Sequence, residues 1–428
     1  MMAPPSLWLY RVLLLLALPL VLPVLLLRDR LTGKRRPPLG DRLARRLPDL
    51  ETGGVWIQAV SVGEVEVARR LVQELGDRRP ELPVLVTATT ATGLELARRG
   101  LADTAQVLPC PLDLPGAVGR MLDAARPQLL VLVETELWPE LLHQAGCRGI
   151  PVAVVNGRLS GASFASYRKL GGLLRSLLKP LSLVLVRDGA DEARFRGLGV
   201  GEDHIRVAGN VKYDLEPDPR PLGWTAEVQR LAGDRPVVVA GSTMEGEEGP
   251  VLDALSQSSG NGRDPFLILA PRHPERFDGV ASLLESRGVV FARRSELPVL
   301  PDRADVFLLD TIGELGRAYG LGSIAYLGGS LVATGGHNPL EPAVWGVPVL
   351  SGSHVFNFQE VFGEMVAAGA ARLVDDHTAL ASALSEWLFD PGAAAAAGAA
   401  GRRVVEQNRG ATARTVDALL DLVDRDEE

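Results

Sequence analysis

The sequence has few of the residues from which disulfide frameworks and metal sites are built. It contains two cysteines, Cys110 and Cys147, and six histidines in 428 residues. Two cysteines cannot form a disulfide framework, and neither has the CxxC or Cys/His spacing that is typical of a metal site. We therefore expect reduced thiols in a cytosolic body, and we predict no metal centre and no cofactor.

An excess of positive charge is also absent. The net charge is −8 at pH 7, which disfavours nucleic acid as a partner, although local basic patches remain compatible with it. A hydrophobic content of 46% indicates ordered globular structure. At 428 residues the chain exceeds what one hydrophobic core usually serves, so two domains of about 150 to 200 residues each are expected.

The amino end differs from the rest, because residues 12–27 contain no polar or charged side chain. A signal peptide is the alternative to a membrane anchor, but no small-residue cleavage site follows, and Arg and Lys residues begin at Arg28. We predict an uncleaved anchor over residues 1–33, with the body on the cytoplasmic side. Pro19 and Pro23 leave open whether it spans the bilayer or inserts shallowly. The basic residues after it either bind anionic lipids or only fix the topology.

After this segment, short apolar runs alternate with helix-length amphipathic stretches, which is typical of parallel sheets covered by helices on both faces. The piece from Tyr213 to Trp224 holds three prolines and charged residues and is predicted to connect two doubly wound domains. The predicted strands cover residues 55–60, 84–87, 129–133, 152–155, 183–186, 237–240, 266–270, 306–309, 324–327 and 348–350.

Polar residues follow many of these strands, at the edge where doubly wound sheets bind ligands. In the first half, Glu64 in SVGE is either a catalytic base or a carboxylate that stabilises a helix start. Glu134 and Glu136 in ETELWP raise each other's pKa, which favours a functional interpretation. Lys212 in GNVKYD suits a phosphate or a carboxylate.

The second half repeats this pattern. GSTMEGEE at 241–248 is a glycine-and-hydroxyl turn before a helix, and Arg272 in PRHPERF could bind phosphate through two hydrogen bonds. In GGHNPLEP, Asn338 is predicted as a helix N-cap, Pro339 as the first helical residue and Glu341 as the partner in a capping box. That helix start is either an anion site or a purely structural cap.

Taken in order, these segments resemble the 3-deoxy-D-manno-octulosonic acid (Kdo) transferase family, inverting glycosyltransferases of the GT-B fold. The resemblance covers nearly the whole chain and includes SVGE, ETELWP, NGRLS, GNVKYD, APRHPERF, DTIGEL and GGHNPLEPAVWGVPVL. It implies two Rossmann-like domains facing a central cleft. The implied divisions are an anchor at 1–33, an acceptor domain at 34–212, a linker at 213–235 and a CMP-Kdo-binding domain at 236–428.

The resemblance also implies the reaction. Kdo would pass from CMP-Kdo to lipid IVA with inversion, in lipopolysaccharide inner-core biosynthesis at the cytoplasmic face of the bacterial inner membrane. Glu64 would be the proton acceptor, and Glu134 and Lys212 would stabilise the transition state. Anionic inner-membrane lipids are further expected partners, and a metal is not expected. The residues implied to hold CMP are Pro271, Arg272, Ile312, Gly313, Glu314, Asn338, Pro339, Leu340 and Glu341.

Some positions depart from the family pattern. Gln58 replaces a histidine that often precedes AVSVGE, Ile312 stands where methionine is common, and residues 186–191 are less typical. A UDP-sugar transferase or a nucleotide-sugar epimerase would share the fold, and a membrane-bound scaffold would need only the anchor. The sequence does not tell the number of Kdo units added, the acyl-chain preference, the oligomeric state or the depth of the anchor.

Overall fold

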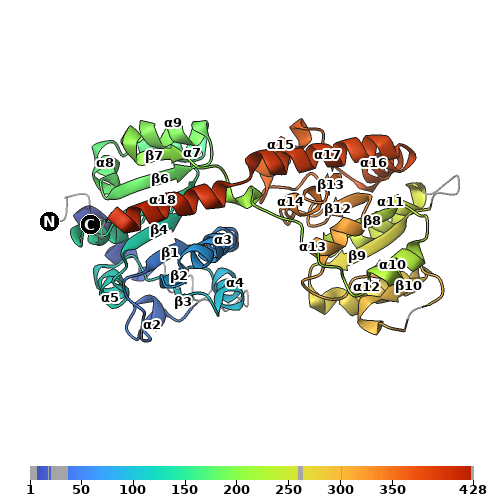
Figure 1. Cartoon of the computed structure of the whole chain (residues 1–428), viewed down its shortest axis with the longest axis horizontal. Coiled ribbons are helices and arrows are strands. Elements are labelled where there is room, and N and C mark those ends of the chain that lie inside the picture. The colour runs from blue at the N-terminus through green and yellow to red at the C-terminus, as the bar shows by residue number, and fades with distance from the viewer. Residues whose placement is uncertain (1–6, 18, 21–36, 259–263, 300, 426–428) are drawn as a thin grey trace. The chain divides into compact units, whose positions relative to one another are not determined.

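The computed structural model describes residues 7–17, 19–20, 37–258, 264–299 and 301–425. The chain divides into two compact units (Figure 1). Unit 1 comprises Met1–Asp214 and Arg409–Glu428, and unit 2 comprises Leu215–Asn408.

Unit 1 contains a parallel sheet with the strand order β3-β2-β1-β4-β5-β6-β7. Its strands are β1 (Val55–Ala59), β2 (Val84–Ala88), β3 (Gln106–Pro109), β4 (Leu129–Val133), β5 (Val152–Gly157), β6 (Leu181–Val186) and β7 (Ile205–Val207). Its helices are α2 (Leu39–Arg42), α3 (Val62–Arg78), α4 (Ala91–Leu101), α5 (Pro115–Ala125), α6 (Pro139–Cys147), α7 (Gly161–Arg168), α8 (Gly172–Leu178), α9 (Gly189–Gly197) and α18 (Ala411–Arg425), with 3-10 turns η1 (Glu202–His204) and η2 (Val211–Tyr213).

Helices bury both faces of this sheet, which explains why strands such as LLVLV in β4 are apolar throughout. Ile57 and Val131 point to the face covered by α3, α4 and α18. Trp56 and Leu130 point to the other face, where α5, α6 and α8 pack. The side chains at the two faces alternate along each strand, as the pleat requires.

Unit 2 repeats the architecture with the order β10-β11-β9-β8-β12-β13-β14. Its strands are β8 (Val237–Thr243), β9 (Phe266–Pro271), β10 (Phe291–Arg293), β11 (Val306–Leu308), β12 (Ile324–Leu327), β13 (Val349–Gly352) and β14 (Ala371–Val374). Its helices are α10 (Thr225–Ala232), α11 (Glu248–Ser258), α12 (Phe277–Ser286), α13 (Leu315–Ala318), α14 (Leu340–Ala343), α15 (Gln359–Ala367), α16 (His377–Phe389) and α17 (Pro391–Asn408), with 3-10 turns η3 (Pro274–Arg276), η4 (Arg294–Glu296) and η5 (Tyr319–Leu321). Helices α11, α12 and α16 cover one face of its sheet.

The two parallel α/β units confirm the expectation of two doubly wound, Rossmann-like domains, but the expected boundaries differ from the observed ones. The C-terminal domain was expected to run from 236 to 428, whereas α18 packs on α3 in unit 1. The linker was expected over 213–235, whereas Trp224 is fully buried in unit 2 and stacks on Phe307 at 4.9 Å between ring centroids. Aromatic burial of this size outweighs the local preference of the prolines for an irregular connector.

The predicted anchor over 1–33 lies partly outside the described residues, which omit 1–6, 18 and 21–33 of it. Residues 7–17 form a helix that lies on unit 1, where Leu7 is fully buried. No helix in the described ranges is long and apolar enough to cross a bilayer.

Candidate active site

Each sheet reverses its winding direction between two paired strands. In unit 1 these strands are β1 and β4, and in unit 2 they are β8 and β12. Doubly wound sheets bind ligands at the carboxyl ends of the strands around such a point. Glu64 and Glu134 follow β1 and β4, and the 338–341 segment follows β12. The predicted residues therefore gather at the expected edge of each sheet.

Glu64 lies in the first turn of α3 and is 6% exposed. One carboxylate oxygen accepts the Val60 N–H at 2.7 Å and the other accepts the Ser61 hydroxyl at 2.8 Å. Burial raises the pKa of Glu64 to about 7, against the opposing effect of these two hydrogen bonds. The carboxylate thus stabilises the start of α3, and it also titrates in the range that suits a general base.

Glu134 directly follows β4 and adopts the left-handed backbone conformation, with φ of 59°. Its Oε1 accepts a hydrogen bond from Lys212 Nζ at 2.8 Å, and its Oε2 lies 3.7 Å from Nε of Arg158. Such a conformation is uncommon for a residue other than glycine and occurs mostly where the surrounding structure enforces it. The structure therefore brings Glu134 and Lys212 together as an ion pair.

Lys212 reaches this pair from η2, far along the chain. The Asn156 side-chain oxygen accepts the Val211 N–H at 3.0 Å, so the NGRLS segment holds the backbone beside Lys212. A Cβ at Gly63 would stand 3.9 Å from Lys212 Nζ, which places the start of α3 next to the ammonium. Glu64, Glu134 and Lys212 thus form one cluster. Asn156 is a positioning residue.

Glu136 lies beside this cluster. Its carboxylate accepts the Trp138 indole N–H at 3.0 Å. Burial is the main cause that raises the pKa of Glu136, and the charge of Glu134 adds to it. The like-charge effect expected from ETELWP is therefore present at Glu136 but secondary to desolvation.

In unit 2, Pro271 ends β9 and Arg272 is exposed directly after it. The backbone N–H of Arg272 donates to the Thr243 carbonyl at 3.0 Å, which connects the end of β9 to the end of β8. Arg276 from the same motif binds the buried Glu248 carboxylate through two hydrogen bonds of 2.8 Å. The Arg276 guanidinium is therefore engaged in an internal ion pair with Glu248, whereas the Arg272 guanidinium faces solvent.

The 312–314 segment has an exposed Ile312 and a tightly held Glu314. Glu314 accepts the Trp224 indole N–H at 2.9 Å and the Arg294 Nε–H at 3.0 Å. Burial acts to raise the pKa of Glu314, but hydrogen bonds from Thr311, Arg294 and Trp224 outweigh it and hold the pKa below its usual range. Through these hydrogen bonds, Glu314 holds the 312–314 turn of unit 2 in place.

The helix expected at Asn338 differs from the observed one. The N-cap of α14 is Pro339 rather than Asn338, and no side chain caps the helix. The Asn338 Oδ1 accepts the Leu340 N–H at 3.1 Å from one residue before the cap, and α14 is a single turn. Gly346, just beyond the helix, adopts the left-handed conformation with φ of 74°. A one-turn helix has little macrodipole, so it adds little positive potential for an anion at this helix start.

The glycine-rich turns of unit 2 are organised by a buried carboxylate. Glu247 is fully buried and accepts the N–H groups of Gly329, Ser330 and Leu331 at 2.6, 2.9 and 2.9 Å. It also accepts the Met244 N–H at 2.9 Å. Glu247 therefore occupies four backbone donors of these turns.

His337, which the sequence analysis did not single out, lies beside these turns. A Cβ at Gly329 would stand 3.1 Å from its Nε2. Burial and then the nearby charge of Arg272 lower the pKa of His337 to about 4, so the ring is neutral at neutral pH. The effect of Arg272 on this pKa is consistent with its position near His337. The position of His337 directly before Asn338 in the motif was the only sequence signal.

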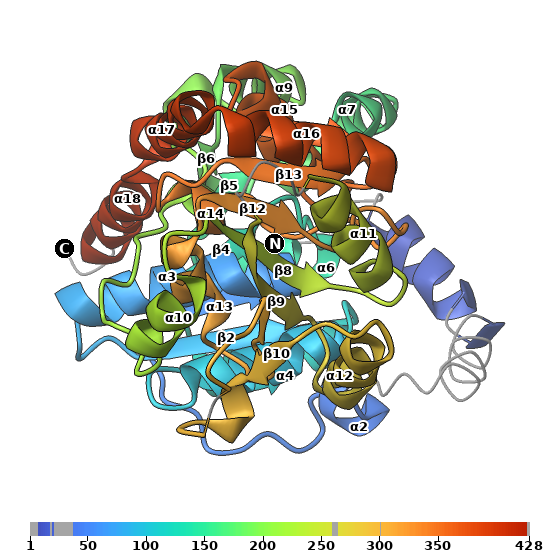
Figure 2. The same cartoon turned by 90° about the vertical axis from the view of Figure 1, so that its right-hand side faces the viewer.

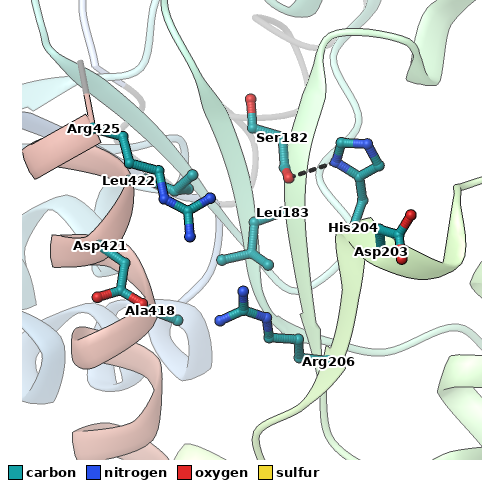
Figure 3. Close-up of a pocket in the computed structure, with 9 residues that line it drawn as sticks. All are labelled: Ser182, Leu183, Asp203, His204, Arg206, Ala418, Asp421, Leu422 and Arg425. Atoms are coloured by element: carbon teal, nitrogen blue, oxygen red, sulfur yellow. Dashed lines mark hydrogen bonds between the residues drawn. The ribbon is translucent and has the colours of Figure 1, made fainter. Parts of the chain in front are cut away.

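A pocket of about 220 Å³ lies elsewhere in unit 1, between β6, β7 and α18. Figure 3 shows Arg206 and Arg425 at its two sides, and the His204 ring against the Ser182 carbonyl at 2.8 Å. It contains none of the predicted site residues. Among the residues described by the structure, no group of three or more His, Cys, Asp and Glu side chains could hold a metal ion.

Comparisons with known proteins identify the family. Residues 31–215 match the family described as 3-Deoxy-D-manno-octulosonic-acid transferase (kdotransferase). A 3-deoxy-D-manno-octulosonic acid transferase of Haemophilus influenzae is 37% identical over 87% of this chain and 88% of its own length. That of Bordetella pertussis is 38% identical over 89% and 90%. This chain belongs to the 3-deoxy-D-manno-octulosonic acid transferase family.

As a member of this family, the protein is a glycosyltransferase. Its fold is shared with solved GT-B-like proteins: UDP-GlcNAc 2-epimerase from Neisseria meningitidis superposes with a TM-score of 0.55 over 87% of this chain and all of that one, at 13% identity. This likeness concerns the fold alone. The resemblance drawn from SVGE, ETELWP and GGHNPLEP is confirmed by the curated relatives.

Proposed function

We propose that this Kdo transferase moves Kdo from CMP-Kdo to lipid IVA, with inversion at the anomeric carbon, in the biosynthesis of the lipopolysaccharide inner core. The observation that carries the proposal is Glu64. It is a buried carboxylate with a pKa of about 7, at the carboxyl end of β1 beside the reversal of strand order. Membership of the family supplies the sugar, and the motif resemblance supplies the donor and the acceptor.

In this mechanism the acceptor hydroxyl oxygen attacks the anomeric carbon. The bond between that carbon and the phosphate oxygen breaks, the electron pair leaves with CMP, and the hydroxyl proton passes to Glu64. Each Glu64 oxygen already accepts one hydrogen bond and keeps a second lone pair for the substrate proton. General base catalysis of this kind contributes a factor of about 10² to 10⁴ in rate. Attack opposite the leaving group inverts the centre in one step.

Glu134 and Lys212 are proposed to stabilise the transition state. The 2.8 Å ion pair holds the Lys212 ammonium in a fixed position, so that it needs no reorganisation when charge develops. Lys212 would supply the positive charge, and Glu134 would orient it.

The CMP moiety is proposed to bind unit 2 at Pro271, Arg272, Ile312, Gly313, Glu314, Asn338, Pro339, Leu340 and Glu341. The solvent-facing Arg272 guanidinium suits a phosphate, with which it can form two parallel hydrogen bonds. Because Trp224 and Arg294 already hold Glu314, we assign it the role of orienting the 312–314 turn.

We also propose that the enzyme is held at the cytoplasmic face of the bacterial inner membrane by its amino-terminal segment, with anionic lipids as partners. The support is the apolar sequence of residues 12–27 and the Arg and Lys residues that follow it.

Metal removal tests one part of the mechanism. We expect EDTA to leave turnover unchanged, because Arg272 and Lys212 are proposed to supply the positive charge that a metal would otherwise provide. Initial rates with and without EDTA, followed by addition of Mg²⁺, measure this. Strict dependence on a divalent ion would contradict it.

The donor and acceptor are tested with the purified enzyme and lipid IVA. We expect CMP-Kdo to yield a Kdo-containing product by mass spectrometry and UDP-hexoses to yield none. The anomeric configuration of the product, read by NMR, tests inversion. Transfer from a UDP-sugar, or retention of configuration, would contradict the proposal.

A further inference from the structure

A long stretch of unit 1 has no acidic residue. Residues 141–187 contain seven Lys and Arg and no Asp or Glu, in a chain whose net charge is −8. Three of these cations have carboxylate neighbours: Arg148 with Asp123 at 2.8 Å, Arg187 with Asp191 at 2.7 Å, and Arg158 with Glu134 at 3.7 Å. The other four fall in residues 161–179, which we call the α7–α8 segment.

These four cations point to solvent. Arg168, Lys169, Arg175 and Lys179 are exposed, and no carboxylate of the described residues lies within 4.0 Å of them. Arg168 lies over the Phe164 ring at 5.9 Å. The α7–α8 segment therefore presents unneutralised positive charge at the surface of an acidic protein.

The same segment has an apolar tip. Leu170, between the two helices, is 46% exposed, and it is followed by Gly171 and Gly172. On the inner side, Leu174 and Leu178 pack into the core of unit 1. An exposed leucine among exposed cations matches the chemistry of an anionic lipid surface, where apolar side chains insert and cations remain at the headgroups.

A second apolar surface is fixed nearby. Helix α8 packs on α6, and α6 carries the fully buried Glu140, which binds Arg11 through hydrogen bonds of 2.7 and 2.8 Å. Tyr10 donates to the buried Asp113 at 2.8 Å. These contacts hold the helix at 7–17 on unit 1 with its apolar side outward. Its large exposed side chains are Trp8, Leu9, Val12, Leu13, Leu15 and Leu16.

We infer that the α7–α8 segment binds directly to an anionic bilayer, beside the helix at 7–17, and so fixes the orientation of unit 1 on the membrane. Both surfaces lie on the α5–α6 side of the unit 1 sheet, and in the view of Figure 2 α7 and the amino-terminal helix both appear toward the right-hand edge. Segment α7–α8 begins just after Arg158, at the carboxyl edge that carries Glu134. A lipid acceptor would then meet the catalytic edge without leaving the bilayer surface, a consequence that rests on the proposed function.

A single fluorophore tests the contact in the full chain. Cys110 is buried, so Cys147→Ser removes the exposed thiol and Leu170→Cys provides one labelling site. With vesicles containing phosphatidylglycerol and brominated lipid, we expect quenching of an environment-sensitive dye at 170. The matched control is Arg98→Cys, on α4 at the opposite face, which should show no quenching. Absence of quenching at 170 would overturn the inference.

Charge reversal separates membrane contact from catalysis. The variant Arg168→Glu/Lys169→Glu/Arg175→Glu/Lys179→Glu should lose the quenching at 170 and turn over acceptor in anionic vesicles at least tenfold more slowly, with unchanged activity on detergent-dispersed acceptor. Arg98→Glu/Arg99→Glu on α4 is the control and should behave as the unmodified protein. Equal loss in vesicles and detergent would overturn the inference, since the segment would then serve the fold or the acceptor site. Failure of the proposed function would differ, because the unmodified enzyme would be inactive in detergent.

Discussion

Among single residues, Glu64 shows how burial decides chemical behaviour. Its carboxylate accepts hydrogen bonds from Val60 and Ser61 at the start of α3. Its burial raises the pKa to about 7. As a general base it must be deprotonated, so the rate is expected to rise with pH up to about 7 and then level off. The sequence placed this glutamate correctly but could not give its burial, which depends on the packing of the whole unit.

The burial of Glu64 also predicts that the ionised form, which activity requires, lowers the stability of the fold. The folded pKa of Glu64 lies above its unfolded value, so protonation stabilises the fold fully at low pH and this contribution is lost as pH rises through about 7. We expect Glu64→Gln to match the unmodified protein in melting temperature at pH 5 and to exceed it at pH 8. A lower melting temperature of the variant at both pH values would show that the carboxylate serves only the helix start.

Among helices and strands, the sequence predicted the central strands and missed the outer ones. The apolar runs at 129–133 and 324–327 coincide with β4 and β12. The strands not predicted are β3, β7, β10 and β14, which are the outermost strands of the two sheets. An outer strand is short and partly exposed, as IRV in β7 illustrates, and so has no continuous apolar run to reveal it.

Strand-end turns were predicted from glycine and hydroxyl patterns, but their internal carboxylate was not. Glu247→Ala would leave four buried or partly buried backbone N–H groups without their acceptor. We expect a loss of about 3 kcal/mol or more in the free energy of unfolding and weaker CMP binding. The exposed Glu245→Ala is the matched control and should change stability by less than about 0.5 kcal/mol. Urea unfolding and CMP titration measure both effects, and a neutral Glu247→Ala would contradict this role.

For the chain as a whole, the return of α18 to unit 1 was beyond sequence reasoning. Asp214 accepts the Gly410 N–H at 2.6 Å and also bonds the Thr412 N–H, across nearly 200 residues. Likewise, Arg11 pairs with Glu140 at a separation of 129 residues. Local patterns give each element and motif, whereas such pairings depend on the tertiary fold of unit 1. This is why the expected domain boundaries at 236–428 and 213–235 differed from the units observed.

The assignment of α18 to unit 1 is testable. Leu419 is fully buried against α3 and the sheet, so Leu419→Ala is expected to cost about 2–5 kcal/mol. Hydrogen exchange should quicken at amides of β1 and β4 and remain unchanged at β8 and β12. The reverse pattern would place α18 with unit 2.

The central claim is that Glu64 accepts the acceptor proton, and the rate of Glu64→Gln at saturating CMP-Kdo and lipid IVA tests it most directly. We expect kcat to fall by about 10² to 10⁴, and the dependence of the residual rate on pH near 7 to disappear, with CMP binding unchanged. A variant that keeps more than a tenth of the rate, or keeps the same pH dependence, would contradict the claim.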